Sequence, residues 1–125
     1  MIVGLGLDVV ELDRISRALD RYGERFLDRI LTEAERSALP KNPVPYISAR
    51  FAAKEAGVKA LGTGFRHGIT LHDLEVFSLD SGKPCLRLMN FALKHSLGLG
   101  VTDIHLSITH GRDIASAVVV LENRS

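Results

Sequence analysis

The 125-residue sequence has a single cysteine, Cys85, no tryptophan and no long apolar run. One cysteine excludes an internal disulfide and a thiolate metal cluster, so we expect a reducing, cytoplasmic compartment. A transmembrane helix needs roughly 20 consecutive apolar residues, so we predict no membrane association. The first residues also lack the basic leader of a secretory signal and turn acidic at Asp8.

The composition is that of an ordinary globular protein, with 46% hydrophobic and 25% charged residues. A chain of this length can bury a hydrophobic core, and we expect one domain spanning residues 1–125. The formal net charge is only +1, so the distribution of charge, rather than its total, must indicate a partner.

Hydrophobic periodicity predicts one strand, then helices, then mostly strands. The expected strands are residues 2–10, 70–79, 85–88, 104–109 and 114–121. The expected helices are one that begins near Leu12 and either breaks at Gly23 or continues to Arg25, and those at residues 33–39, 50–61 and 90–97, with Asn90 as a candidate N-cap. Thr32 and Glu35 form a capping box, and Pro40, Pro43 and Pro45 predict a stiff connection before the helix at 50–61. This order favours an α+β fold with an antiparallel sheet packed against helices over a doubly wound sheet.

The first strand carries two glycines and a carboxylate on one face. Gly4, Gly6 and Asp8 alternate with Leu5 and Leu7, so the two sets point to opposite faces. Glycine inside a strand often marks the close approach of a ligand or of another backbone. Asp8 is therefore either a functional carboxylate beside open space or a cap for the helix that follows.

Arginines recur on one face of the first helix. If the helix continues past Gly23, Arg14, Arg17, Arg21 and Arg25 fall within an arc of roughly 80°. Neighbouring acidic residues favour a solvated, salt-bridged face. The alternative is a surface that docks an acidic partner, because arginine forks match carboxylates and phosphates.

The segment from Arg50 to Gly64 places Glu55 and Lys59 among small side chains. Four residues apart, they share one helical face, and Gly62, Thr63 and Gly64 then end the helix. A carboxylate and an ammonium beside a glycine turn suggest a site for a ligand that is both anionic and metal-bound. The alternative is an ordinary exposed Glu–Lys pair.

Three stretches carry a resemblance to a known family. GLGLDVVELDRI, RFAAKEAGVKALGTGF and LSITHGRDIASAVVVL together resemble holo-acyl-carrier-protein synthase, the small bacterial 4′-phosphopantetheinyl transferase family. The blocks occur in the family's order, and the resemblance covers essentially the whole chain. It implies the transferase-like α+β fold and transfer of 4′-phosphopantetheine from coenzyme A to a serine of apo acyl carrier protein, with release of 3′,5′-ADP, in fatty acid biosynthesis.

The same resemblance assigns roles to individual residues. Asp8 and Glu55 match the ligands of a catalytic Mg²⁺, which commonly binds one or two carboxylates, waters and substrate phosphates. Lys59 matches the active-site lysine. The attacking serine needs a base, which is either Glu55 or a water on the metal. Larger relatives carry a third carboxylate where this chain has Val10, so we expect water in that position.

The resemblance also implies contacts of this chain with coenzyme A and with the carrier protein. Gly62, Thr63 and Gly64 match the coenzyme-A-binding turn, whose backbone N–H groups can face phosphate. His110, otherwise a turn residue before Gly111, matches a nucleotide contact made across a subunit boundary, and Arg50 is expected to add charge near the same cleft. The predicted carrier-protein contacts are Arg14, Arg21, Arg25 and Phe26 from the resemblance, with Arg17 added on geometry alone. The resemblance further implies a homotrimer with sites at subunit interfaces.

A hypothesis from another class is a non-catalytic binding module that holds an acidic protein or a nucleic acid on its basic helix. Nucleic acid is disfavoured because Asp8 and Glu55 would repel its phosphates. Stacking surfaces are also scarce, with five phenylalanines and two tyrosines. We therefore expect no nucleic-acid partner.

Overall fold

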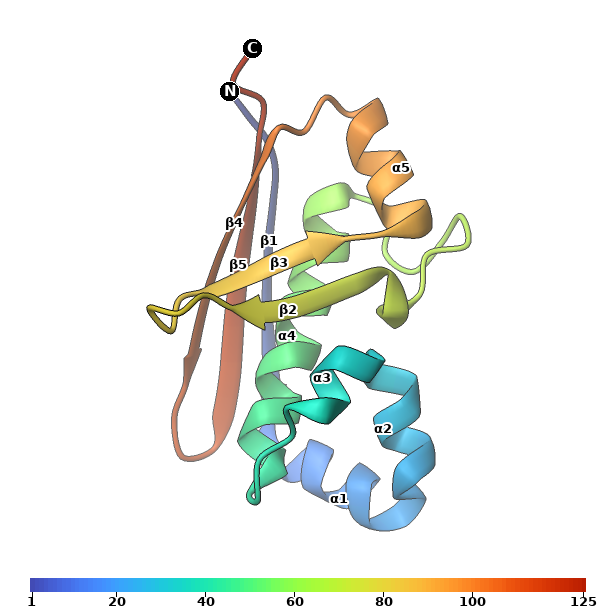
Figure 1. Ribbon diagram of the computed structural model, residues 1–125, viewed down its shortest axis with the longest axis vertical. Coiled ribbons are helices and arrows are strands. Elements are labelled where there is room, and N and C mark those ends of the chain that lie inside the picture. Colours follow the sequence, from blue (N-terminus) through green and yellow to red (C-terminus); the bar gives the residue numbers. More distant parts are fainter.

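The computed structural model describes residues 1–125 and has the predicted alternation of strand, helices and strands (Figure 1). The elements are β1 (Ile2–Glu11), α1 (Leu12–Tyr22), α2 (Glu24–Ile30), α3 (Glu33–Ser37), α4 (Pro43–Leu61), the 3-10 turn η1 (Leu71–Asp73), β2 (Leu74–Ser78), β3 (Pro84–Leu88), α5 (Asn90–Gly98), β4 (Asp103–His110) and β5 (Ile114–Glu122). The α+β prediction is confirmed, since every strand pair is antiparallel.

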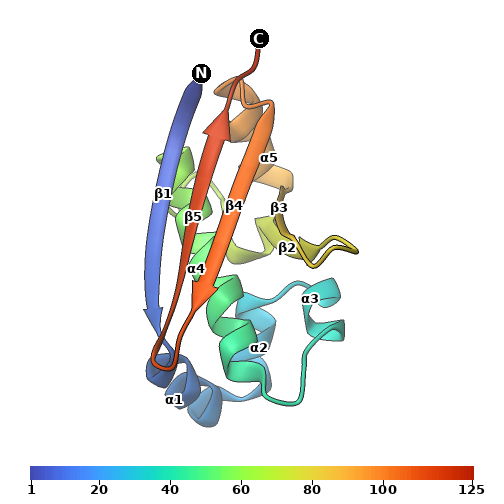
Figure 2. The same cartoon turned by 90° about the vertical axis from the view of Figure 1, so that its left-hand side faces the viewer.

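The strands form two separate sheets. One has the order β1-β5-β4, and the other is the β2-β3 hairpin. Helix α4 packs against one face of the three-stranded sheet, while no helix covers the opposite face in Figure 2. A single cluster of 21 buried apolar residues joins α4 to both sheets, so one core serves the whole chain. No helix combines the length and apolar character that crossing a bilayer requires.

The two glycines of β1 let the strand lie directly on the backbone of α4. A Cβ on Gly4 would lie 2.1 Å from the carbonyl oxygen of Ala60, and one on Gly6 would lie 1.9 Å from that of Ala56. No side chain fits at such distances, so the glycines serve the approach of another backbone rather than open space for a ligand. This contact brings β1 and α4 together at the level of Asp8.

Helix α4 begins earlier than predicted. Pro43 and Pro45 lie in its first turn instead of in a connecting segment. The first N–H groups of a helix have no partner within the helix, so prolines are tolerated there. Its C-terminal end is as expected, with Gly62 in the left-handed conformation at φ 79°.

Of the two alternatives at Gly23, the structure shows the break and not the continuous helix. Gly23 has φ 55° and ψ −127°, which ends α1 at Tyr22 and lets α2 begin in a new direction. Arg25 therefore belongs to a different helix from Arg14. Glycine adopts this conformation without the steric cost that a side chain would add.

Other boundaries differ by a few residues. The strand expected from Thr70 begins only at Leu74, after η1, and α5 has Met89 rather than Asn90 as its N-cap residue. The side-chain amide of Asn90 lies 3.4 Å from Asp73 Oδ1, so it does not cap the helix. The capping box of α3 is confirmed, with Thr32 and Glu35 exchanging both hydrogen bonds.

Candidate active site

Asp8 and Lys59 meet where β1 crosses α4. Lys59 Nζ donates hydrogen bonds to Asp8 Oδ1 at 2.9 Å and to the carbonyl of Leu7 at 3.2 Å. The Asp8 side chain is 14% exposed and that of Lys59 is 52% exposed, so solvent and ligands reach the pair from the lysine side. The hydrogen bond and the charge of Asp8 raise the pKa of Lys59, which therefore stays protonated at neutral pH.

Glu55 completes this cluster from one turn earlier on α4. Burial is the main cause that raises the pKa of its carboxyl group, and the negative charge of Asp8 raises it further. Lys59 and Arg14 act in the opposite direction. Two carboxylates and one ammonium thus influence one another, and the metal-binding and catalytic roles that the resemblance assigns to them stay predictions.

The donor set suits a hard divalent cation. Two carboxylates that repel each other are stabilised when a cation lies between them, and Mg²⁺ prefers oxygen ligands. No three His, Cys, Asp or Glu side chains come together in a metal-binding arrangement. The chain therefore offers two carboxylates, and water and substrate phosphate would have to supply the other ligands.

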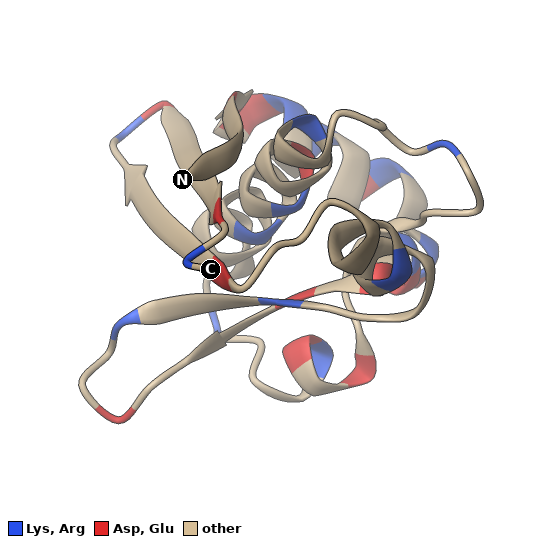
Figure 3. Cartoon of the chain, turned by 90° about the horizontal axis from the view of Figure 1, so that it is seen from above, with Lys and Arg blue, Asp and Glu red and all other residues tan.

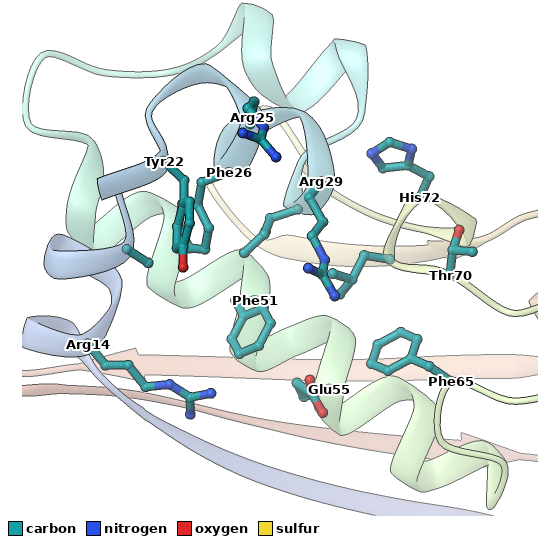
Figure 4. Close-up of a pocket in the computed structure, with 13 residues that line it drawn as sticks. Arg14, Tyr22, Arg25, Phe26, Arg29, Phe51, Glu55, Phe65, Thr70 and His72 are labelled. Carbon is teal, nitrogen blue, oxygen red and sulfur yellow. The ribbon is translucent and has the colours of Figure 1, made fainter. Parts of the chain in front are cut away.

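Beside Glu55 lies an open cavity of about 930 Å³. Arg14, Arg25 and Phe26, which are predicted to contact the carrier protein, line it together with Glu55, which is predicted to bind the metal and to act in catalysis. Figure 4 shows Phe51 and Phe65 on either side of Glu55, with Arg29 reaching towards the gap between them. Arginines from α1 and α2 and a carboxylate from α4 thus face one another across apolar walls.

Several lining residues were missed from the sequence. They are Tyr22, Arg29, Phe51, Phe65, Thr70 and His72. Arg29 carried a usable signal, because it follows Arg25 by one helical turn. Phe65 and His72 carried none, because their loop reaches the cavity only through tertiary packing.

Two of the predicted arginines do not line the cavity. Arg17 forms an exposed ion pair with Asp13 at 3.3 Å, and Arg21 lies over the ring of Tyr22 at 5.4 Å. Figure 3 shows blue and red segments interspersed along the chain, in keeping with the small net charge. Arginine is therefore concentrated at the cavity, where Arg14, Arg25 and Arg29 lie, and not along the whole chain.

The glycine turn after α4 is arranged differently from the expectation. The N–H groups of Gly62, Thr63 and Gly64 all point to the carbonyl of Val58, at 3.1, 3.3 and 3.3 Å. They complete the end of the helix rather than standing free for phosphate. Coenzyme A binding at this turn stays a prediction.

Neither Arg50 nor His110 lines the cavity beside Glu55. The Arg50 guanidinium stacks 3.8 Å above the ring of Tyr46, and its buried Nε has no hydrogen-bond partner. His110 pairs with Ala115, which pairs with Val10, so His110 lies two strands, roughly 10 Å, across the sheet. Their predicted contacts to coenzyme A stay predictions, and that of His110 needs a second subunit.

Comparison with known proteins identifies the family. The sequence model of the 4′-phosphopantetheinyl transferase superfamily matches residues 4–118. The chain belongs to this superfamily. The "Holo-[acyl-carrier-protein] synthase" of Maridesulfovibrio salexigens is 64% identical over 123 residues, which cover 98% of this chain and 99% of that protein. The predicted resemblance is confirmed.

Solved structures of superfamily members share the fold over nearly the whole chain. The holo-(acyl-carrier-protein) synthase of Bacillus anthracis, a complex with CoA (3′,5′-ADP), is 40% identical with a TM-score of 0.82, covering 98% of both chains. That of Neisseria meningitidis is 37% identical with a TM-score of 0.91, covering 98% of this chain and 100% of that one. In the present chain, Asp8 of the first sequence block lies close enough to Glu55 of the second for its charge to raise the pKa of Glu55.

Proposed function

We propose that this chain transfers 4′-phosphopantetheine from coenzyme A to a serine of apo acyl carrier protein. The carrying observation is the cluster of Asp8, Glu55 and Lys59, which lies beside an arginine-lined cavity. The relatives named holo-[acyl-carrier-protein] synthase indicate the two substrates, coenzyme A and acyl carrier protein. Fatty acid biosynthesis in the cytoplasm is the proposed setting.

The proposal includes a magnesium requirement. Asp8 and Glu55 would hold the ion, since they are the two carboxylates that share this site. Bound Mg²⁺ would neutralise charge on the pyrophosphate as it breaks. Metal binding requires an ionised Glu55, and the raised pKa of this carboxyl group makes the requirement pH-dependent.

In the transfer step, the serine oxygen forms a bond to the β-phosphorus of coenzyme A while the bond from that phosphorus to the bridging oxygen breaks. The serine proton passes to Glu55 or to water, and the electron pair of the broken bond leaves with 3′,5′-ADP. Lys59, kept charged by Asp8, stabilises the departing phosphate rather than donating its proton.

The cavity is the proposed docking surface for the carrier protein. Arg14, Arg25 and Phe26 line it, and Arg29 adds a further cation on the same side. Arginine forks bind carboxylates in pairs of hydrogen bonds, so an acidic helix fits this wall. Arg17 and Arg21 lie outside the cavity and would act on the approaching partner at longer range.

We also propose that the chain works as a homotrimer. The uncovered face of the sheet exposes Leu5, Leu7 and Val9, which are 65%, 61% and 56% exposed. A contiguous apolar face of this kind commonly marks a protein–protein contact. Association would also allow His110 of a neighbouring subunit to contribute to the nucleotide site, which a single chain does not complete.

Mass spectrometry tests the proposed reaction. Apo acyl carrier protein incubated with this protein, coenzyme A and Mg²⁺ should gain the mass of phosphopantetheine, and EDTA should abolish the gain. No gain with several bacterial carrier proteins would refute the proposal. Retained binding of those carrier proteins would then favour a non-catalytic docking module.

A further inference from the structure

A buried ion pair lies behind the cavity. Lys54 Nζ is 2.6 Å from Glu35 Oε1, and the two side chains are 0% and 1% exposed. Neither residue lines the cavity. Burying two charges is costly unless their geometry and hydrogen bonding are good, so the pair requires an explanation.

Lys54 has a second partner at the end of α2. Its Nζ donates a hydrogen bond of 2.6 Å to the carbonyl of Ile30, the last residue of that helix. The last carbonyls of a helix have no partner within the helix, and a cation there is favoured by the helix dipole. Lys54 of α4 therefore caps α2.

Glu35 fixes the position of the ammonium from the other side. Its carboxylate accepts hydrogen bonds from the backbone N–H of Thr32 at 2.9 Å and of Val76 at 2.8 Å. One carboxylate thus connects the start of α3 to β2. Lys54, a residue of α4, bonds to this carboxylate and to Ile30, so it links the end of α2 to α4 and to Glu35.

Helix α2 depends on such contacts because it has only seven residues. So short a helix is unstable by itself and takes its position from tertiary packing. It carries Arg25, Phe26 and Arg29 into the cavity, opposite Phe51 and Glu55 of α4. Any shift of α2 therefore alters the distance between these arginines and Glu55.

We propose that Lys54 is a positioning residue that holds the α2 wall of the cavity at a fixed distance from Glu55 by capping α2 through Ile30. Loss of this cap loosens α2 and weakens recognition of the acidic carrier protein, while coenzyme A binding is little affected. The kinetic consequence rests on the proposed function. The structural consequence, a loosened α2, does not.

Two variants separate positioning from simple stabilisation. Lys54→Met removes the cap but leaves Glu35 charged and buried, which is strongly destabilising. The double variant Lys54→Met with Glu35→Gln also removes that charge, and it should be more stable than Lys54→Met without restoring the bond to Ile30. A glutamine amide accepts through one oxygen only and loses the bond to Thr32 or to Val76, so Glu35→Gln alone, which keeps Lys54 on Ile30, is the comparison for the double variant. Arg124→Met is the matched control, since it breaks another ion pair, with Asp103 at the start of β4, away from α2.

Amide hydrogen exchange is the readout that needs no activity. In the double variant, residues 24–31 should exchange about tenfold faster than in Glu35→Gln, with β5 unchanged and Arg124→Met like the wild type. Exchange at residues 24–31 that is no faster in the double variant than in Glu35→Gln would overturn the proposal. So would acceleration spread evenly over the chain, because the pair would then stabilise the whole fold and not position α2.

Kinetics then test the effect on recognition. In the double variant, KM for the carrier protein should rise about fivefold or more, with KM for coenzyme A within about twofold of the wild type. Equal changes in both constants would refute the effect on docking. An inactive wild type would refute the proposed function instead, and hydrogen exchange would still decide whether Lys54 positions α2.

Discussion

Lys59 and Asp8 are 51 positions apart in the sequence and are joined by a hydrogen bond of 2.9 Å. The bond keeps the ammonium charged by raising its pKa, and it places this charge at the side of Asp8 that faces solvent. A lysine held in this way is suited to stabilise an anion during reaction, because its charge is present before the substrate arrives.

Glu55→Gln should lower turnover by about a hundredfold or more, because it removes one of the two carboxylates proposed to hold the metal. The measurement is the initial rate of carrier-protein modification as Mg²⁺ is varied. Glu11→Gln is the matched control, since Glu11 is an exposed carboxylate at the end of the same strand as Asp8. Near-normal turnover of Glu55→Gln at limiting Mg²⁺ would contradict metal ligation by Glu55.

The same substitution should stabilise the metal-free protein at neutral pH. The folded pKa of Glu55 is raised above its ordinary value of 4.5, so the native state binds more protons than the unfolded state between the two values. Stability therefore falls as pH rises through that window. Urea unfolding should show a higher free energy of unfolding for Glu55→Gln at neutral pH.

This advantage should vanish below the ordinary pKa, where Glu55 is protonated in both states. Adding Mg²⁺ should reverse the order, because the ion stabilises only the protein that binds it. An advantage for Glu55→Gln that persists unchanged in strong acid would assign the effect to packing instead of ionisation.

Arg14→Glu combined with Arg25→Glu should raise KM for the carrier protein by about tenfold or more, since both arginines line the cavity. KM for coenzyme A should change much less, and the effect should shrink at high salt. Lys83→Glu, an exposed charge reversal at the β2-β3 turn, is the control. Parallel rises in both constants would refute the docking role.

Gly6→Ala should destabilise the protein by about 2–4 kcal/mol, because its Cβ would lie 1.9 Å from a backbone oxygen of α4. Gly98→Ala provides the comparison, since nothing lies within 4 Å of its Cβ and helices favour alanine over glycine. Denaturant unfolding of the two variants tests this directly. Equal stability of Gly6→Ala and the wild type would mean that the strand and helix can separate freely.

Leu7→Glu should convert the proposed trimer into monomers, because it places a charge on an exposed apolar face of the sheet. Sedimentation velocity reports the mass of each species. The control is Leu79→Glu, another exposed leucine located at the hairpin turn. A wild-type protein that sediments as a monomer would remove the basis for sharing His110 between subunits.

The elements on either side of the site could be predicted from the sequence. Alternation over β1 and the small apolar residues of α4 both predicted the right element type. The meeting of Asp8 and Glu55 came from the family resemblance, since periodicity does not determine which strand lies on which helix. Gly23 shows a second limit, because one glycine is compatible with both a continuous helix and a break.

The cavity was harder to foresee. Its walls combine α1, α2, α4 and the loop before β2, and this combination depends on the tertiary arrangement. The Lys54–Glu35 pair illustrates the same limit, since a lysine beside Glu55 looks like one more surface charge in the sequence. Its burial follows only when α3 and β2 close over α4.

The contact of Gly4 and Gly6 with α4 has a consequence for evolution of the protein. Main-chain atoms set the separation between Asp8 and Glu55, so exchanges among the larger core side chains leave it nearly constant. The core can therefore drift in composition while the geometry needed for chemistry is inherited unchanged.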